Sequence, residues 1–181
     1  MPDTPAANTI STWDLLWRVR QSALYHLKRE RFLDGVDKAA KLVSALGGAA
    51  AFSQFKSAGD LGLWITGSIT VVATLSLVYG PSAKARKHAE LARDFKRLEA
   101  DVVRAGKLSS EAEMAKFDAQ YLTLESTEPA SLGALVTQCH NELCEAYGVR
   151  DQITPLRVRD RLFKNWFDID QTMAHSAPVA K

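Results

Sequence analysis

One stretch of the sequence, residues 61–80 (LGLWITGSITVVATLSLVYG), carries no charged side chain. As a helix rising 1.5 Å per residue it would be roughly 30 Å long, which matches the hydrocarbon core of a bilayer. A helix at the surface of a soluble protein normally presents a charged or polar face to water. The stretch therefore predicts a membrane-spanning helix, and the alternative is a helix buried at the centre of a soluble bundle.

A second uncharged stretch, residues 42–55 (LVSALGGAAAFSQF), comes just before it. This stretch is too short to cross a bilayer unaided, but Lys41 and Lys56 can snorkel from its ends and extend the usable segment to residues 39–58. Small residues recur four apart, as Ser44 with Gly48 and Gly47 with Ala51. Such pairs let two helices approach closely in lipid. The segment predicts the first helix of a transmembrane hairpin, and the alternative is an Ala/Gly-rich interfacial or soluble helix.

The charges around this hairpin predict its orientation. Lysine and arginine are frequent before residue 42 and after residue 80, whereas the connecting turn KSAGD (residues 56–60) contains a single lysine. By the positive-inside rule both termini are expected in the cytoplasm. Gly59 suits the turn between the helices, and Gly80-Pro81 suits the exit from the membrane into a new helix.

Two groups of side chains give the hairpin a candidate function. Membrane-interface anchors are expected at Trp64, Tyr79, Lys41 and Lys56. Thr66, Thr70 and Thr74 repeat every four residues and form a mildly polar stripe, which is the candidate lining of a pore. The alternative for these hydroxyls is a hydrogen bond to the carbonyl one turn back, against a neighbouring helix.

Helical patterns fill the rest of the chain, so an all-α fold is expected. An amphipathic N-terminal helix with Trp13, Trp17 and Leu24 would lie on the membrane surface or pack on the protein's own bundle. The predicted organisation has four parts: the N-terminal helix and lead-in (1–38), the two-helix transmembrane hairpin (39–80), a cytoplasmic helical region (81–148), and a C-terminal helix and tail (149–181).

The cytoplasmic region begins with a stripe suited to helix packing. Its members are spaced four, three and four residues apart: Leu91, Phe95, Leu98 and Val102. We expect this stripe to be the seam between copies in a homo-oligomer. Gly106 is predicted to end this helix, and Ser110 with Glu113 forms a capping box for the next one, which folds back on the first. A further helix is expected from Glu128-Pro129, and a last one near Leu162.

Nothing in the sequence indicates an enzyme. Cys139 and Cys144 are five residues apart, about 500° around a helix, so they do not share a face and make a poor metal site. No catalytic residues, metal ligands or cofactor are predicted, because the chain has no phosphate-binding glycine loop or nucleophile elbow. A formal net charge of +2 also gives no reason to expect a nucleic-acid partner.

The order of these parts resembles a known family. After the basic lead-in and the paired hydrophobic segments come KARKHAELARDFKRLEADV (84–102) and ESTEPASLGALVTQCHNEL (125–143). Over residues 13–147 the chain resembles a SLATT domain, a two-transmembrane effector associated with SMODS nucleotidyltransferases and SLOG sensor domains. The short first hydrophobic segment is a departure from that pattern.

The resemblance implies a function. It implies a bacterial defence protein that oligomerises and permeabilises the inner membrane when a nucleotide-sensing or nucleotidyltransferase partner signals phage infection. The family brings no catalytic residues, and membrane lipid is the other expected partner. Two alternatives remain open on the sequence: a soluble helical scaffold or adaptor, and a phage holin-like lysis protein.

Overall fold

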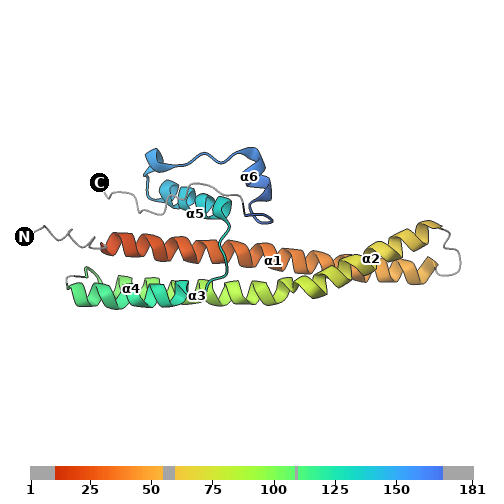
Figure 1. The fold of residues 1–181 in the computed structure, drawn as a ribbon, viewed down its shortest axis with the longest axis horizontal. Helices are drawn as coiled ribbons and strands as arrows, with labels where there is room; N and C mark the ends of the chain where they lie inside the picture. The colour runs from red at the N-terminus through yellow and green to blue at the C-terminus, as the bar shows by residue number, and fades with distance from the viewer. Residues whose placement is uncertain (1–10, 55–59, 109, 169–181) are drawn as a thin grey trace, which may run out of the picture. The chain divides into compact units, whose positions relative to one another are not determined.

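The structure, a computed structural model, is built from helices alone over the residues it describes, which are 11–54, 60–108 and 110–168. The side chains of residues 48–54, 60, 61, 63, 65 and 66 lie outside the described part. The elements in chain order (Figure 1) are α1 (Thr12–Gln54), α2 (Asp60–Tyr79), α3 (Pro81–Ala105), α4 (Glu111–Glu125), α5 (Gly133–Ala146), the short helix η1 (Arg150–Gln152) and α6 (Val158–Phe163). The predicted all-α class is confirmed.

The chain divides into two compact units. Unit 1 contains residues 1–27 and 90–181, and unit 2 contains residues 28–89. Helices α1 and α3 each contribute to both units, because each runs without a break past the boundary. The predicted four-part organisation, with the hairpin at residues 39–80, stays a prediction.

Capping residues set the ends of several helices. The Ser11 hydroxyl accepts a hydrogen bond from the Asp14 N–H at 3.1 Å, while the Asp14 carboxylate accepts from the Ser11 N–H at 3.0 Å, so a capping box starts α1. The predicted box at Ser110 is confirmed, since its hydroxyl accepts from the Glu113 N–H at 3.1 Å. Gly80 and Gly106 take positive φ values of 59° and 75° and end α2 and α3 as expected.

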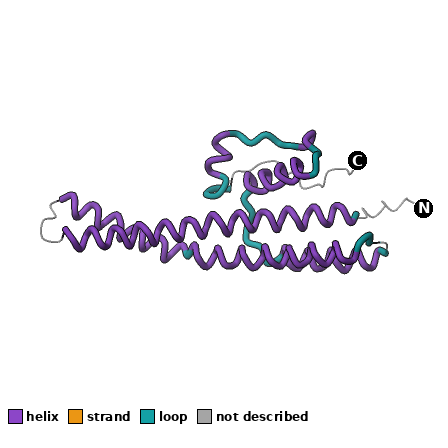
Figure 2. Tube along the Cα trace, turned by 180° about the vertical axis from the view of Figure 1, so that it is seen from behind, coloured by secondary structure: helices purple, strands orange, loops and turns teal. Residues whose placement is uncertain are grey.

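In unit 1 the first part of α1 is buried on two sides. One face packs against α3 and α4, and its cluster consists of Leu15, Val19, Ala23, Phe95, Leu98, Val102 and Tyr121. The opposite face, with Trp17 and Tyr25, packs against α5 through Leu135, Cys139, Leu143 and Cys144. Figure 2 shows the same arrangement, with α1 between α3 and α4 on one side and α5 on the other. The N-terminal helix thus packs on the protein's own bundle, which was one of its two predicted placements.

The start of α5 corrects one prediction. The helix begins at Gly133 and not at Glu128-Pro129, because Leu132 is extended (φ −98°, ψ 111°). Two distant side chains hold this start in place. The Tyr25 hydroxyl accepts from the Leu132 N–H, and the Asp168 carboxylate accepts from the Gly133 N–H, both at 3.1 Å.

Unit 2 contains the second part of α1, all of α2 and the start of α3. Its buried side chains, which include Arg29, Leu33, Asp37, Ala85 and His88, lie outside residues 38–80. Within residues 38–80, no side chain that the structure describes is buried. None of the helices, over the residues described, combines the length and the apolar character that crossing a membrane requires.

Candidate functional site

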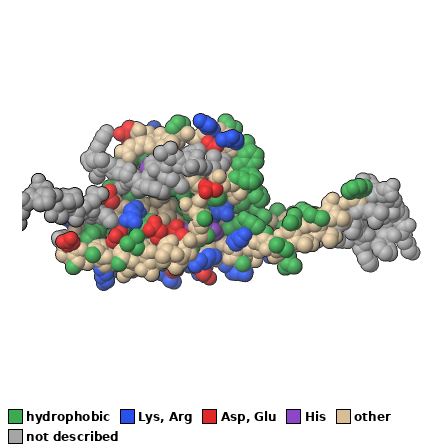
Figure 3. Space-filling view, in the orientation of Figure 1, with side chains coloured by type: hydrophobic (Ala, Val, Ile, Leu, Met, Phe, Trp, Pro, Cys, Tyr) green, Lys and Arg blue, Asp and Glu red, His purple; other side chains and the backbone are tan. Residues whose placement is uncertain are grey.

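The uncharged part of α2 exposes its apolar side chains. Leu77 is 84% exposed, Val78 80% and Leu75 62%. Val71 and Val72 are exposed as well. In Figure 3, hydrophobic side chains stand along the described part of the hairpin. A soluble protein rarely leaves so much contiguous apolar surface in water, so this surface is the strongest candidate for an interaction site.

The part of α1 that shares the hairpin with α2 also exposes apolar side chains. Leu42, Val43 and Leu46 are all exposed, although they share the hairpin with α2. Charged side chains lie just before the uncharged stretch of α1. Lys41 pairs with Asp37 and Lys38 with Asp34, with 2.6 Å between the ammonium nitrogen and a carboxylate oxygen in each pair. The apolar surface of the hairpin is therefore bordered by ion pairs at this end.

Helices α1 and α2 approach closely at Gly47. A Cβ atom added at this glycine would overlap the Ile69 side chain, with 2.6 Å to its Cγ1. Real side-chain carbons do not come so close, so a larger residue at position 47 would force the Ile69 side chain to move. Gly47 belongs to the pattern of small residues that predicted close helix packing.

Replacing Gly47 by valine should therefore destabilise the hairpin by about 1–3 kcal/mol, the typical cost of overpacking. Thermal unfolding of the full chain in detergent micelles, followed by circular dichroism, measures the loss. Gly67→Val is the matched control, because a Cβ at Gly67 meets nothing within 4 Å. Gly47→Val combined with Ile69→Ala should recover stability, and equal melting of the Gly47 and Gly67 variants would contradict the close approach.

The predicted pore-lining threonines are only partly described. Thr70 and Thr74 are exposed on α2, and the side chain of Thr66 lies outside the described residues. The Ser68 hydroxyl donates to the Trp64 carbonyl at 2.8 Å, which illustrates the alternative use of a hydroxyl on this helix. Thr70 and Thr74 therefore lie on an exposed face of α2.

The predicted interface anchors have mixed surroundings. Trp64 is 76% exposed near the start of α2. Tyr79 at the other end is also exposed, and the Lys84 ammonium lies 3.4 Å from the centre of its ring, a cation–π contact. Lys41 forms the ion pair with Asp37, and Lys56 lies outside the described residues.

The stripe expected to join copies has another use in the structure. Leu91, Phe95, Leu98 and Val102 are all buried within one chain, with exposures of 0–4%. Three of them pack against α1 and α4 in unit 1, so they are not available to a second copy in this fold. The spacing correctly indicated a buried face, but the partner of that face is the N-terminal part of α1.

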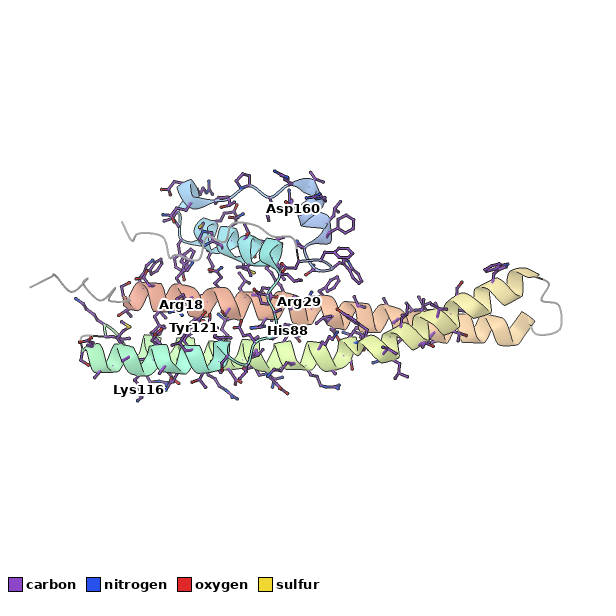
Figure 4. The ribbon with its side chains drawn as sticks, viewed as in Figure 1. Arg18, Arg29, His88, Lys116, Tyr121 and Asp160 are labelled. Atoms are coloured by element: carbon purple, nitrogen blue, oxygen red, sulfur yellow. The ribbon has the colours of Figure 1, made fainter. Side chains whose placement is uncertain are left out.

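A cavity in unit 1, lined mainly by polar residue types, was not predicted. Its volume is about 330 Å³, and α1, α4, α5 and the segment between α4 and α5 line it. At its wall the Arg18 guanidinium lies 4.1 Å from the centre of the Tyr121 ring and pairs with Asp118 at 2.9 Å (Figure 4). The sequence signal was an arginine in the middle of the apolar pattern of α1.

His26 lies deeper in the same unit. Its side chain is fully buried and stacks on the Phe95 ring, with 5.7 Å between the ring centres. Its Nε2 atom lies 3.1 Å from a carboxylate oxygen of Glu128. The imidazole therefore links α1 to the segment that follows α4. Through these contacts Arg18 and His26 connect α1 with α4 and with the segment that follows it.

The two cysteines lie on α5 and are buried and unbridged. The Cys144 sulfur lies 3.4 Å from His140 Nε2. Burial raises the pKa of the Cys144 thiol, which favours the protonated, unreactive form. No three His, Cys, Asp or Glu side chains come together to hold a metal ion in the part of the chain that the structure describes.

His140 makes the stability of unit 1 depend on pH. Burial lowers the pKa of His140, and a hydrogen bond to the Gln152 backbone offsets only part of this effect. A depressed pKa means that the unfolded chain binds the proton more tightly, so stability is present above about pH 6.5 and falls as the pH drops below it. The free energy of unfolding measured in urea should therefore be lower at pH 5.5 than at pH 7. His140→Gln should flatten this slope, and an unchanged slope would exclude His140 as its source.

Comparisons with protein-family models, with curated proteins and with solved structures returned no match to this chain.

Proposed function

We propose that this chain is a membrane effector: its hairpin enters a lipid bilayer, several copies assemble, and the assembly permeabilises the membrane. One observation carries the proposal. Most of the apolar side chains that the structure describes on α2 are exposed, although no charged residue follows Asp60 in this 20-residue helix. Since no described helix meets the requirement for a span, the proposal rests on this exposure and on the uncharged sequence of residues 61–80.

The energetic reason is the hydrophobic effect. Full burial of a leucine or valine side chain stabilises by about 1.5–3 kcal/mol. Leu75, Leu77 and Val78 are each more than half exposed, so their transfer into lipid alone would gain several kcal/mol. Tyr79 with Lys84 at one end, and the ion pairs of Lys38 and Lys41 on α1, supply groups that favour the headgroup region.

Assembly follows from the size of the hairpin. Two helices from one chain cannot enclose a water-filled path, so a pore needs several copies. Because the stripe from Leu91 to Val102 is used inside the chain, we place the contacts between copies on the hairpin itself. The exposed side chains of Thr70 and Thr74 supply a mildly polar face that tolerates water.

The likeness to SLATT domains supports the biological setting of the proposal. It favours a bacterial inner membrane with both termini in the cytoplasm, and a nucleotide-sensing or nucleotidyltransferase partner that triggers the effector during phage infection. The basic residues on both sides of residues 42–80 support this orientation.

A soluble helical scaffold is the second candidate. The specific observation in its favour is that no described helix is long and apolar enough to span a membrane. In a scaffold the exposed side chains of α2 would pack on helices of a partner protein. A holin-like lysis protein would share the hairpin, but it has little need of a second packed unit such as unit 1.

Dye release from vesicles tests the permeabilising step. The chain is added to vesicles of phosphatidylethanolamine and phosphatidylglycerol loaded with a self-quenching dye, and release is expected. Thr70→Val with Thr74→Val keeps the shape of both side chains but removes their hydroxyls, so release should fall severalfold while the amount of bound protein stays constant. Equal release by the variant would show that this face does not line the path, and no release by the parent chain at high coverage would contradict permeabilisation.

A further inference from the structure

The last described helix, α6, buries an acidic side chain and exposes its apolar side chains. Asp160 is only 2% exposed, and Lys164 and Asn165, just after the helix, are half-buried. The apolar side chains of this segment are instead exposed: Val158 (73%), Leu162 (69%), Phe163 (45%), Trp166 (56%) and Phe167 (62%). We call these five side chains the α6 patch.

The members of the α6 patch lie close together along the chain. Val158, Leu162 and Trp166 recur every four residues, and the rings of Phe163 and Phe167 lie 6.0 Å apart. Figure 3 shows hydrophobic side chains gathered at the α6 end of unit 1, with Lys and Arg side chains beside them. Contiguous aromatic and aliphatic surface of this kind marks an interaction site in a folded protein.

The charges around the patch are mainly basic. Arg157, Arg159 and Arg161 are exposed. The two acidic residues that the structure describes in this segment are engaged with the protein itself, since Asp160 is buried and Asp168 accepts a hydrogen bond from the Gly133 N–H. An apolar partner with negative charge at its edge would complement this surface.

We propose that the α6 patch binds the surface of an anionic lipid bilayer. Tryptophan and phenylalanine favour the region between headgroups and hydrocarbon, and arginines beside them pair with lipid phosphates. An acidic protein would satisfy the arginines but would leave five exposed apolar side chains to be covered by a matching apolar surface. A bilayer satisfies both requirements, and the apolar side chains enter it while the arginines stay at the headgroups.

This contact is independent of the proposed hairpin insertion. A chain whose hairpin stays out of the membrane would still bind anionic lipid through the α6 patch. Conversely, the hairpin would insert into the bilayer whether or not the α6 patch touches it. The two proposals can therefore fail separately.

A local probe tests the contact. Leu162→Cys is labelled with an environment-sensitive fluorophore such as NBD, and the native Cys139 and Cys144 interfere little because both are buried. Lys116→Cys, at an exposed position on α4, is the control. Vesicles of phosphatidylcholine alone are compared with an equal mixture of phosphatidylcholine and phosphatidylglycerol. We expect the emission at position 162 to shift to the blue with the anionic vesicles, less so at high salt, while position 116 stays unchanged.

A second measurement separates this contact from the hairpin. Val71→Asp with Leu75→Asp puts charge on the exposed face of α2 and removes hairpin insertion without adding positive charge. In this background, partition onto the anionic vesicles should persist, and Arg157→Gln with Arg161→Gln should reduce it roughly thirtyfold. Arg159 is kept, because its guanidinium lies 3.6 Å from the buried Asp160.

Three outcomes would overturn the proposal. The first is an unshifted probe at position 162 on anionic vesicles that have bound the protein, which would leave an acidic protein as the partner of the patch. The second is an equal shift at positions 162 and 116. The third is a shift of the same size on phosphatidylcholine alone, which would exclude the role of the arginines.

Discussion

Replacing Phe95 and Leu98 by aspartate should unfold unit 1. Both side chains are nearly inaccessible, with exposures of 0% and 4%, and they pack against α1 and α4. Two uncompensated carboxylates in this cluster would cost at least about 5 kcal/mol, which is comparable with the whole stability of a typical domain. Far-UV circular dichroism and urea unfolding of the full chain should show the loss of helix and of the main transition.

The same variant distinguishes two uses of this stripe. If the stripe joined copies, the substitutions would dissociate an oligomer and leave each chain folded. Val103→Asp with Leu122→Asp is the matched control, because these side chains on α3 and α4 are 55% and 48% exposed. The control should unfold like the parent chain, since exposed substitutions usually change stability by less than about 0.5 kcal/mol. A folded but dissociated Phe95 and Leu98 variant would contradict the core placement.

Replacing Val71 and Leu75 by aspartate should release the hairpin from membranes. Each charge near the centre of a membrane helix costs about 2.5–3.5 kcal/mol, so the pair should lower insertion by more than a thousandfold. The variant, added to phosphatidylcholine vesicles, should stay at the bottom of a density gradient while the parent chain floats. Phosphatidylcholine alone is used so that the arginines beside the α6 patch contribute little.

The Val103 and Leu122 double aspartate serves as the control here too, because it adds the same two charges to exposed positions in unit 1. It should float like the parent chain. Flotation of the Val71 and Leu75 variant to the same extent as the parent would mean that this face of α2 does not enter lipid.

Local signals in the sequence predicted the helices and several of their ends. Ser110 and Gly106 act within one turn of the chain, so their effect can be read without knowledge of the rest of the fold. The start of α5 could not be predicted in this way. It depends on Tyr25 and Asp168, which lie 107 and 35 residues away from the groups they bind.

The candidate sites show the same difference between local sequence signals and contacts between distant residues. The spacing of Leu91, Phe95, Leu98 and Val102 predicts a buried face but does not say which helix buries it, because apolar periodicity is the same for a partner within the chain and in another copy. Residues 61–80 could be identified as a candidate site because their lack of charge is visible in the composition of the sequence alone. The α6 patch was missed because an apolar stripe is normally assigned to a core, whereas in α6 the buried side is the one with Asp160.

The most direct test of the account asks whether position 75 on α2 lies in lipid. The variant Leu75→Cys is bound to phosphatidylethanolamine and phosphatidylglycerol vesicles and treated with a charged, membrane-impermeant maleimide before and after detergent is added. Gln120→Cys, at an exposed position on α4 in unit 1, reports the reactivity of a cysteine in water. If the hairpin inserts, position 75 is protected until detergent dissolves the vesicles, while position 120 reacts at once. Equal and rapid labelling of both positions on intact vesicles would contradict membrane insertion and would favour the soluble scaffold.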